Sequence, residues 1–366
     1  MKKALIFISI LIIFFLANSC NRENEPSNEF LINEKQLNWN KLLLIQRPMC
    51  DLPDVVGDEH CKSLSGLAYC KGDTLTSYVS IEKTSSISYI IFSINGGSKW
   101  SLQSSQNGLI ISTNQFGGTS FALRKFLGKT EFGIGIQYGA SWLWKPIPKN
   151  PDKIRALNLD TLYAFGDNGI VVSENGGNSW NIQNNMIASD IQNYDDSTLI
   201  GVFDNEIKLS NNLGKTWNTL YTANFDLNFI KKSNENTWFA GGKNGCLIKS
   251  TDNGLSWTQK FLLINVYPTA TYSIATDILM IDDNNGFATI DCQFPVDCGD
   301  SFKNMISCIL KTTDGGETWN INYRTEFIHY TELVSAKGPK ISAFGTQNRD
   351  KYISGAYVTF TKTLGN

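Results

Sequence analysis

The chain of 366 residues is 42% hydrophobic and 12% aromatic, which supplies ample apolar side-chain area for a core and excludes a chain that is disordered throughout. Its 32 basic and 34 acidic residues give a formal net charge of −2. No stretch gathers basic residues into a stripe, so the composition argues against nucleic acid as a partner.

The first 19 residues are predicted to be a secretory signal peptide. A basic start precedes an apolar run from Ala4 to Ala17, which is shorter than the roughly 20 residues that a membrane-spanning helix needs. The end of this run resembles a bacterial lipoprotein cleavage site, in which Ser19 precedes the cut and Cys20 carries the lipid. Residues 20–35 are predicted to form a flexible tether. We therefore expect a protein of the bacterial cell envelope, lipid-anchored at the outer membrane or the cell surface and touching the membrane through that anchor alone.

An eight-residue motif, Ser/Thr-x-Asn/Asp-x-Gly-x-x-Trp, recurs after the tether. Its Asn or Asp can bond the backbone two residues on, its Gly supplies a positive φ, and its hydroxyl adds a second local bond. The Trp then returns a large apolar area to the core, so the motif predicts a tight turn between two strands. The motif positions are Ser93, Asn95, Gly97 and Trp100; Ser173, Asn175, Gly177 and Trp180; Ser210, Asn212, Gly214 and Trp217; Ser250, Asp252, Gly254 and Trp257; and Thr312, Asp314, Gly316 and Trp319.

The motif tryptophans recur at intervals of about 40 residues. A degenerate copy ending at Trp142 fills the double interval between Trp100 and Trp180, and an insert lengthens the interval before Trp319. A period of this length, made of short β-branched segments punctuated by Gly, is typical of the blades of a β-propeller.

The two ends of the chain complement each other. After the last motif come two strand-like segments, residues 340–345 and 357–362, with no Trp strand behind them. Residues 37–42, which include Trp39, resemble a Trp strand without a blade. We predict that this N-terminal strand completes the last blade, which leaves no open edge between the first and last blades. The predicted fold is an all-β, seven-bladed β-propeller that forms a single domain over residues 36–366.

Several cysteines are expected to form disulfides, because an exported protein meets an oxidising compartment. Cys292 and Cys298 bracket a short loop and are predicted to pair with each other. Cys50 and Cys61 bracket a second irregular segment, and Cys70 competes for either of them.

Two further cysteines, Cys246 and Cys308, each precede a motif Trp by the same interval and are interpreted as buried thiols in equivalent strands. The chain has no Cys-x-x-Cys spacing and two histidines, so no metal site and no cofactor is predicted.

The eight-residue motif resembles the Asp-box, or BNR repeat, which occurs in sialidases, sortilin-type receptors, some endoglucanases and assembly factors of photosystem II. The segment 164–173 and the motif copy at 313–319 are most similar to those of the assembly factors. The resemblance covers residues 100–366 and implies a propeller in which the motif turns lie on the outer rim and have a structural role.

A sialidase-type site would need three Arg on a substrate carboxylate and a Tyr nucleophile with a Glu. Arg47, Arg155 and Arg324 could supply the triad, with Tyr330 beside Glu332 as the nucleophile pair. With six Arg in the chain this match is opportunistic, so no catalytic residue is assigned. The favoured function is a non-enzymatic, lipid-anchored module that binds or assembles an unknown protein or glycan partner. The alternative is a sialidase-like glycoside hydrolase or lectin.

Overall fold

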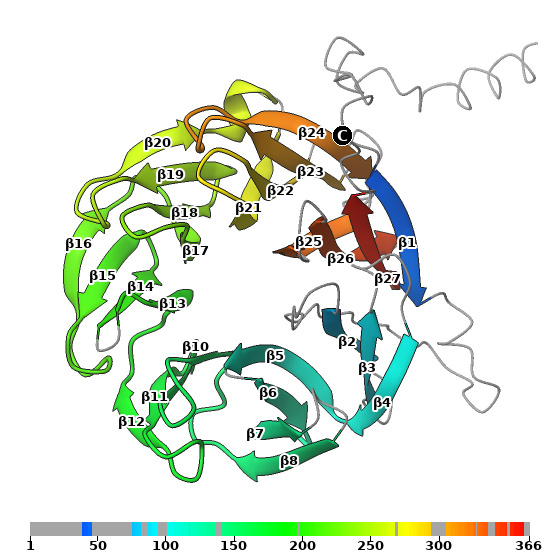
Figure 1. Ribbon diagram of the computed structural model, residues 1–366, viewed down its shortest axis with the longest axis vertical. Coiled ribbons are helices and arrows are strands. Elements are labelled where there is room, and N and C mark those ends of the chain that lie inside the picture. Colours follow the sequence, from blue (N-terminus) through cyan, green and yellow to red (C-terminus); the bar gives the residue numbers. More distant parts are fainter. Residues whose placement is uncertain are drawn as a thin grey trace, which may run out of the picture.

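The computed structural model describes residues 39–45, 75–81, 87–93, 101–116, 118–136, 141–195, 198–267, 270–293, 305–326, 328–335, 341–349 and 352–361. These residues form antiparallel sheets set side by side around a common centre (Figure 1). In this part of the chain no helix has both the length and the apolar character needed to cross a membrane. The predicted signal, the tether and Cys20 lie outside the described residues.

The strands that can be described make six four-stranded sheets and one three-stranded sheet. In chain order they are β1 (Trp39–Ile45), β2 (Leu75–Ile81), β3 (Ile87–Ser93), β4 (Ser101–Asn107), β5 (Leu109–Phe116), β6 (Thr119–Phe126), β7 (Lys129–Ile136), β8 (Ser141–Pro146), β9 (Lys153–Ala156), β10 (Leu162–Gly166), β11 (Gly169–Ser173), β12 (Asn181–Asn184), β13 (Asp190–Asn193), β14 (Leu199–Phe203), β15 (Glu206–Ser210), β16 (Asn218–Thr222), β17 (Leu227–Lys232), β18 (Trp238–Gly242), β19 (Cys246–Ser250), β20 (Thr258–Phe261), β21 (Tyr272–Met280), β22 (Gly286–Gln293), β23 (Met305–Thr312), β24 (Asn320–Glu326), β25 (Ile328–Ser335), β26 (Ile341–Arg349) and β27 (Tyr352–Thr361), with one short 3-10 helix, η2 (Leu263–Asn265), after β20.

The core lies between neighbouring sheets, and the alternation of side chains along a strand explains it. In β10, Leu162 and Ala164 belong to a cluster that contains Phe132 of the preceding sheet. Tyr163 and Phe165 point the other way, into a cluster shared with the following sheet. Strands buried on both faces must be apolar at every position, which is why they read as continuous hydrophobic runs. Each fully buried large side chain stabilises the stack by about 1.5–3 kcal/mol.

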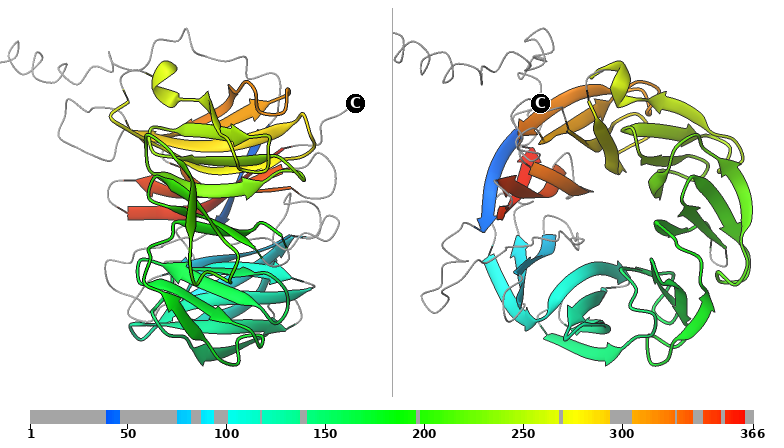
Figure 2. Two further views of the ribbon diagram at one scale, coloured as in Figure 1. Left: turned by 90° about the vertical axis from the view of Figure 1, so that its left-hand side faces the viewer. Right: turned by 180° about the vertical axis from the view of Figure 1, so that it is seen from behind.

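Within one sheet the strands lie one after another from the common centre to the outer rim (Figures 1 and 2). The inner strands β5, β9, β13, β17 and β21 contact one another around the centre, whereas the fourth strands β12, β16 and β20 are largely exposed. Sheets arranged radially in this way make a β-propeller, so the predicted fold class is confirmed at that level.

The last sheet contains both ends of the described chain. Its strand order is β1-β27-β26-β25, and β1 pairs antiparallel with β27 in a register that sets Trp39 opposite Thr361. In Figure 1, β1 lies on the outer side of this sheet.

The eight-residue motif forms the turn that leads from the third strand of a sheet to the fourth. In the copy that begins at Ser173, the serine Oγ accepts the N–H of Gly177 at 2.8 Å and donates to Asn175 Oδ1 at 3.0 Å. The same Asn175 oxygen accepts the N–H of Ser179 at 2.9 Å. Copies 210–217, 250–257 and 312–319 repeat these bonds.

The motif glycines have the positive φ that the sequence predicts, for example +80° at Gly177 and +84° at Gly316. A Cβ on Gly177 would lie 2.0 Å from Cε1 of Phe132 in the preceding sheet. This turn therefore needs glycine for both its backbone conformation and its close packing. Within the first copy, Asn95, Gly97 and Trp100 lie outside the described residues.

Candidate binding site

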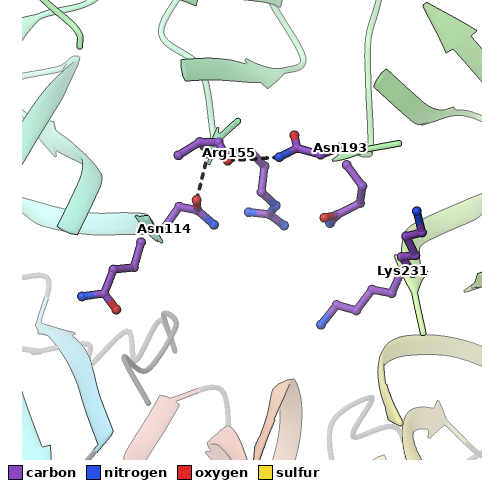
Figure 3. A pocket seen from close by; sticks show the side chains of 8 residues that line it. Asn114, Arg155, Asn193 and Lys231 are labelled. Carbon is purple, nitrogen blue, oxygen red and sulfur yellow. Dashed lines mark hydrogen bonds between the residues drawn. The ribbon is translucent and has the colours of Figure 1, made fainter. Parts of the chain in front are cut away.

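A cavity of about 290 Å³ lies where four successive inner strands end. It is polar, and its walls come from β5, β9, β13 and β17 (Figure 3). The residues that line it are Asn114, Gln115, Arg155, Ala156, Gln192, Asn193, Lys231 and Lys232. The lining residues come as consecutive pairs near the ends of these strands, and seven of the eight are polar or charged.

Arg155 lines this cavity, and the carboxylate of Asp190 in the next sheet holds its guanidinium. Its Nη1 donates to the carbonyl of Ile154 at 3.0 Å, and its Nη2 lies 3.2 Å from Oδ1 of Asp190. Asp190 is buried, and its Oδ2 accepts the N–H of Ile230 at 3.2 Å. The bonds from Asp190 keep the arginine at the wall of the cavity, and Figure 3 shows its guanidinium directed toward the open side.

Two lysines continue the cationic wall. Lys231 Nζ lies 2.6 Å from Oδ1 of Asp277, a buried residue of the following sheet. Lys232 Nζ donates to the carbonyl of Tyr194 at 3.1 Å and lies over the rings of Tyr194 and Trp238. Each cation is therefore held by a group of a different sheet or by an aromatic face, which limits its freedom before any ligand arrives.

Lys153 shares β9 with Arg155 but does not line the cavity. Its Nζ donates to the carbonyl of Ser189 at 2.6 Å. Burial is the largest influence on its pKa and lowers it below the ordinary value, Asp190 and Asp277 oppose this effect, and the neighbouring cations Arg155 and Lys231 add to it. Without Lys153, the three lining cations Arg155, Lys231 and Lys232 still outnumber the two paired carboxylates, Asp190 and Asp277.

Amide side chains complete the site and fix the end of β9. Asn114 Oδ1 accepts the N–H of Ala156 at 2.9 Å, and Asn193 Nδ2 donates to the carbonyl of the same residue at 3.3 Å (Figure 3). Amides and cations together can donate hydrogen bonds to carboxylate or carbonyl oxygens of a ligand. In the described part of the chain, no group of three or more His, Cys, Asp or Glu side chains is placed to hold a metal ion.

The motif residues predicted to be structural lie away from this cavity, at the turns before the exposed fourth strands. Their backbone bonds tie the turn to the loop after the inner strand of the same sheet. The N–H of Gly176 donates to Asp160 O at 2.8 Å, and the N–H of Gly315 donates to Asn284 O at 2.8 Å.

The arginines of the sialidase-type alternative do not come together. Arg155 lies on the inner strand β9, whereas Arg324 lies on β24, at the outer edge of another sheet (Figure 1). Tyr330 and Glu332 lie on β25, and a bulge in the β25–β26 pairing falls between them. Arg47 lies outside the described residues.

The predicted pairing of Cys292 with Cys298 stays a prediction, because Cys298 lies outside the described residues. Cys292 is a free, buried thiol in the central strand β22, and its Sγ donates to the carbonyl of Ile306 at 3.1 Å. The strand register directs the Cys292 side chain into the core. Cys298, Cys50 and Cys61 lie outside the described residues.

Sequence reasoning considered Arg155 for another site and missed the remaining lining residues. A usable signal was present, because polar residues alternate with apolar ones immediately before the inner-strand turns, as in Lys153-Ile154-Arg155-Ala156 and Asp190-Ile191-Gln192-Asn193. Their convergence required the relative placement of four sheets.

Comparison with known proteins supports the fold. No family model matches the chain, and no curated protein matches it. It is similar to the structure of YCF48 bound to D1 peptide, at 12% identity and a TM-score of 0.59 over 88% of this chain and 95% of that one. YCF48 from Cyanidioschyzon merolae gives 12% identity and a TM-score of 0.59, over 88% and 98%. An ancestral GH74 enzyme gives 16% identity and a TM-score of 0.53, over 71% of this chain and 37% of that enzyme. At these identities the likeness establishes the propeller fold alone.

Proposed function

We propose that this protein is a non-enzymatic binding or assembly module that holds a protein partner at the ends of its inner strands. The observation that carries the proposal is the charge of the cavity, since three cations and four amides line it and its eight lining residues include no carboxylate. Asp or Glu side chains, or a C-terminal carboxylate, of a partner would complement this wall. YCF48 was solved with a D1 peptide, which supports a polypeptide as the class of ligand.

The size of the cavity suits part of a larger partner. Its volume of about 290 Å³ is just below the range of about 300–1,000 Å³ for small-molecule pockets. We infer that a short acidic segment enters, and that the rest of the partner lies over the neighbouring loops.

We propose a ring of seven blades over residues 36–366 that is closed by the N-terminal strand. The antiparallel register of β1 with β27 supports this closure. The recurring bonds of the eight-residue turns support assigning them to the Asp-box, or BNR, class.

We further propose that residues 1–19 are removed, that residues 20–35 tether the propeller, and that a lipid on Cys20 anchors it in the bacterial envelope. This part of the proposal rests on the sequence of the first 20 residues. Cells that express the chain, fed with an alkyne fatty acid, should label the wild type and not Cys20→Ala. Equal labelling of both chains would end this part of the proposal.

An array of eight-residue peptides tests the function, with each sequence printed as the C-terminal acid and as the amide. Binding should rise with the number of carboxylates and should weaken when salt is raised, because salt screens charge pairs near the surface. Binding that ignores peptide charge would contradict the proposal. A glycan array and a fluorogenic sialoside, run with the same protein, test the sialidase-like or lectin alternative, and sialoside hydrolysis would replace the proposal.

A further inference from the structure

Two cysteines share one face of the sheet formed by β21–β24. The β22–β23 register sets Cys292 opposite Ile306 and Cys308 opposite Ile290. Residues two apart in a strand point to the same face, so the cysteines are diagonal neighbours across one antiparallel pair. Both belong to the same core cluster, with exposed fractions of 1% and 0%.

The two thiols also interact. The Cys292 thiol donates to the Ile306 carbonyl at 3.1 Å, and its interaction with the Cys308 side chain raises its pKa. Diagonal neighbours in a regular antiparallel pair are about 7–8 Å apart, with Cβ atoms somewhat closer. A disulfide requires Cα atoms about 4.4–6.8 Å apart, so bond formation needs a local approach of β22 and β23.

Cys246 provides an internal comparison. It occupies the strand position in β19 that the sequence equates with Cys308, and it is also buried. Its described core cluster contains no second cysteine, and burial raises the pKa of its thiol to about 12. Cys246 should therefore remain a thiol under conditions that oxidise a neighbouring pair.

We propose that Cys292 and Cys308 form a disulfide that joins β22 to β23 during folding. The bond would close the chain around residues 293–307 and clamp the two strands that precede and follow the segment 294–304. In the reaction, a small-molecule or protein disulfide accepts two electrons from the two thiols. Two S–H bonds are lost, one S–S bond forms between the cysteines, and the oxidant leaves as two thiols.

Burial fixes the order of events. The interaction with the Cys308 side chain and then burial raise the pKa of the Cys292 thiol, and only a thiolate attacks a disulfide. Exchange should therefore take place before the core closes. Formation in the cell relies on the proposed export to an oxidising compartment, whereas the pairing itself can be tested on the purified chain.

The test is to unfold the full chain, refold it in a mixture of reduced and oxidised glutathione, block free thiols with N-ethylmaleimide in denaturant, and map the unreduced peptides by mass spectrometry. A peptide that links Cys292 to Cys308, with Cys246 recovered in its blocked form, is the expected result. A link from Cys292 to Cys298, or recovery of Cys292 and Cys308 as blocked thiols, would overturn the proposal.

A second measurement does not depend on peptide recovery. Dithiothreitol should lower the melting temperature of the oxidised wild type by about 5 °C, the shift expected for losing one such bond in a large domain. In the variant carrying Cys292→Ala and Cys308→Ala, dithiothreitol should not cause this decrease in melting temperature, whereas in Cys246→Ala it should. Equal shifts in all three chains would contradict the bond.

Discussion

Arg155 and Asp190 belong to neighbouring sheets, and a distance of 3.2 Å joins guanidinium Nη2 to carboxylate Oδ1 at the wall of the cavity. The other oxygen of Asp190 accepts the N–H of Ile230 from a third sheet at 3.2 Å. One buried carboxylate therefore connects β9, β13 and β17 and orients the arginine. The packing of these three sheets and the geometry of the proposed site depend on the same side chain.

Asp190→Ala should lower the free energy of unfolding by about 3 kcal/mol, because it leaves Arg155 and a buried N–H without their acceptor. Asp190→Asn keeps one acceptor oxygen and should cost less. The control is Asp226→Ala, which removes the exposed partner of Lys243 and should cost about 0.5 kcal/mol. Urea unfolding measures all three, and equal losses for Asp190→Ala and Asp226→Ala would contradict the three-sheet connection.

The motif glycines should differ in their tolerance of a side chain. Gly177 and Gly254 both have positive φ, but a Cβ at Gly177 would lie 2.0 Å from Phe132, and one at Gly254 would lie 3.4 Å from Ile200. Gly254→Ala should cost about 1 kcal/mol from backbone strain, and Gly177→Ala about 3 kcal/mol because overpacking is added. Thermal melting of the two variants, side by side, checks this order. Similar melting temperatures would show that the turn at Gly177 does not pack closely against Phe132 of the preceding sheet.

The motif aspartates should give the fold a specific acid sensitivity. Hydrogen bonds from Ser256 and Thr318 are the main reason that the pKa values of Asp252 and Asp314 are lowered to about 2. A carboxylate with a lowered pKa contributes stability that is complete above about pH 4 and is lost as the pH falls toward 2. In the copy at 210–217, Asn212 has no charge, and it accepts the N–H of Thr216 and donates to the Thr216 hydroxyl.

The double variant Asp252→Asn and Asp314→Asn should therefore melt close to the wild type at pH 7. Between pH 4 and pH 2 its melting temperature should fall less steeply than that of the wild type. A pH series of thermal melts tests this, and parallel curves through that range would show that these carboxylates do not contribute to acid unfolding.

The motif turns were predictable because the side-chain bonds that shape them lie within eight residues, as between Ser173 and Gly177. The propeller class followed from their period. The cavity was not predictable, because Arg155, Asp190 and Lys231 meet only through the placement of successive sheets. The relation of Cys292 to Cys308 was not predictable for a related reason, since strand register rather than sequence distance makes them diagonal neighbours.

Deletion of β1 tests the proposed closure of the ring. A chain that begins at residue 46 would expose the edge of β27 along the register from Trp39 to Ile45. An exposed strand edge is a template for association, so the shortened chain should melt at a lower temperature and form oligomers. Light scattering and thermal melting provide the measurement. A monomeric chain with wild-type melting behaviour would contradict the closure and the count of seven blades.

The most direct test of the binding proposal compares two pairs of substitutions that each remove two positive charges. Arg155→Gln with Lys232→Gln alters the cavity, and Lys215→Gln with Lys243→Gln alters exposed positions elsewhere on the ring. Neither lysine of the control pair lines the cavity, and Asp190 keeps backbone donors when Arg155 is replaced.

The measurement is fluorescence anisotropy with a labelled acidic peptide recovered from the array, after thermal melting has confirmed that both variants fold. The account predicts that the cavity pair weakens binding at least tenfold, about 1.4 kcal/mol, while the control pair stays within about twofold of the wild type. Equal weakening by both pairs, or wild-type affinity in the cavity pair, would contradict the assignment of this cavity as the binding site.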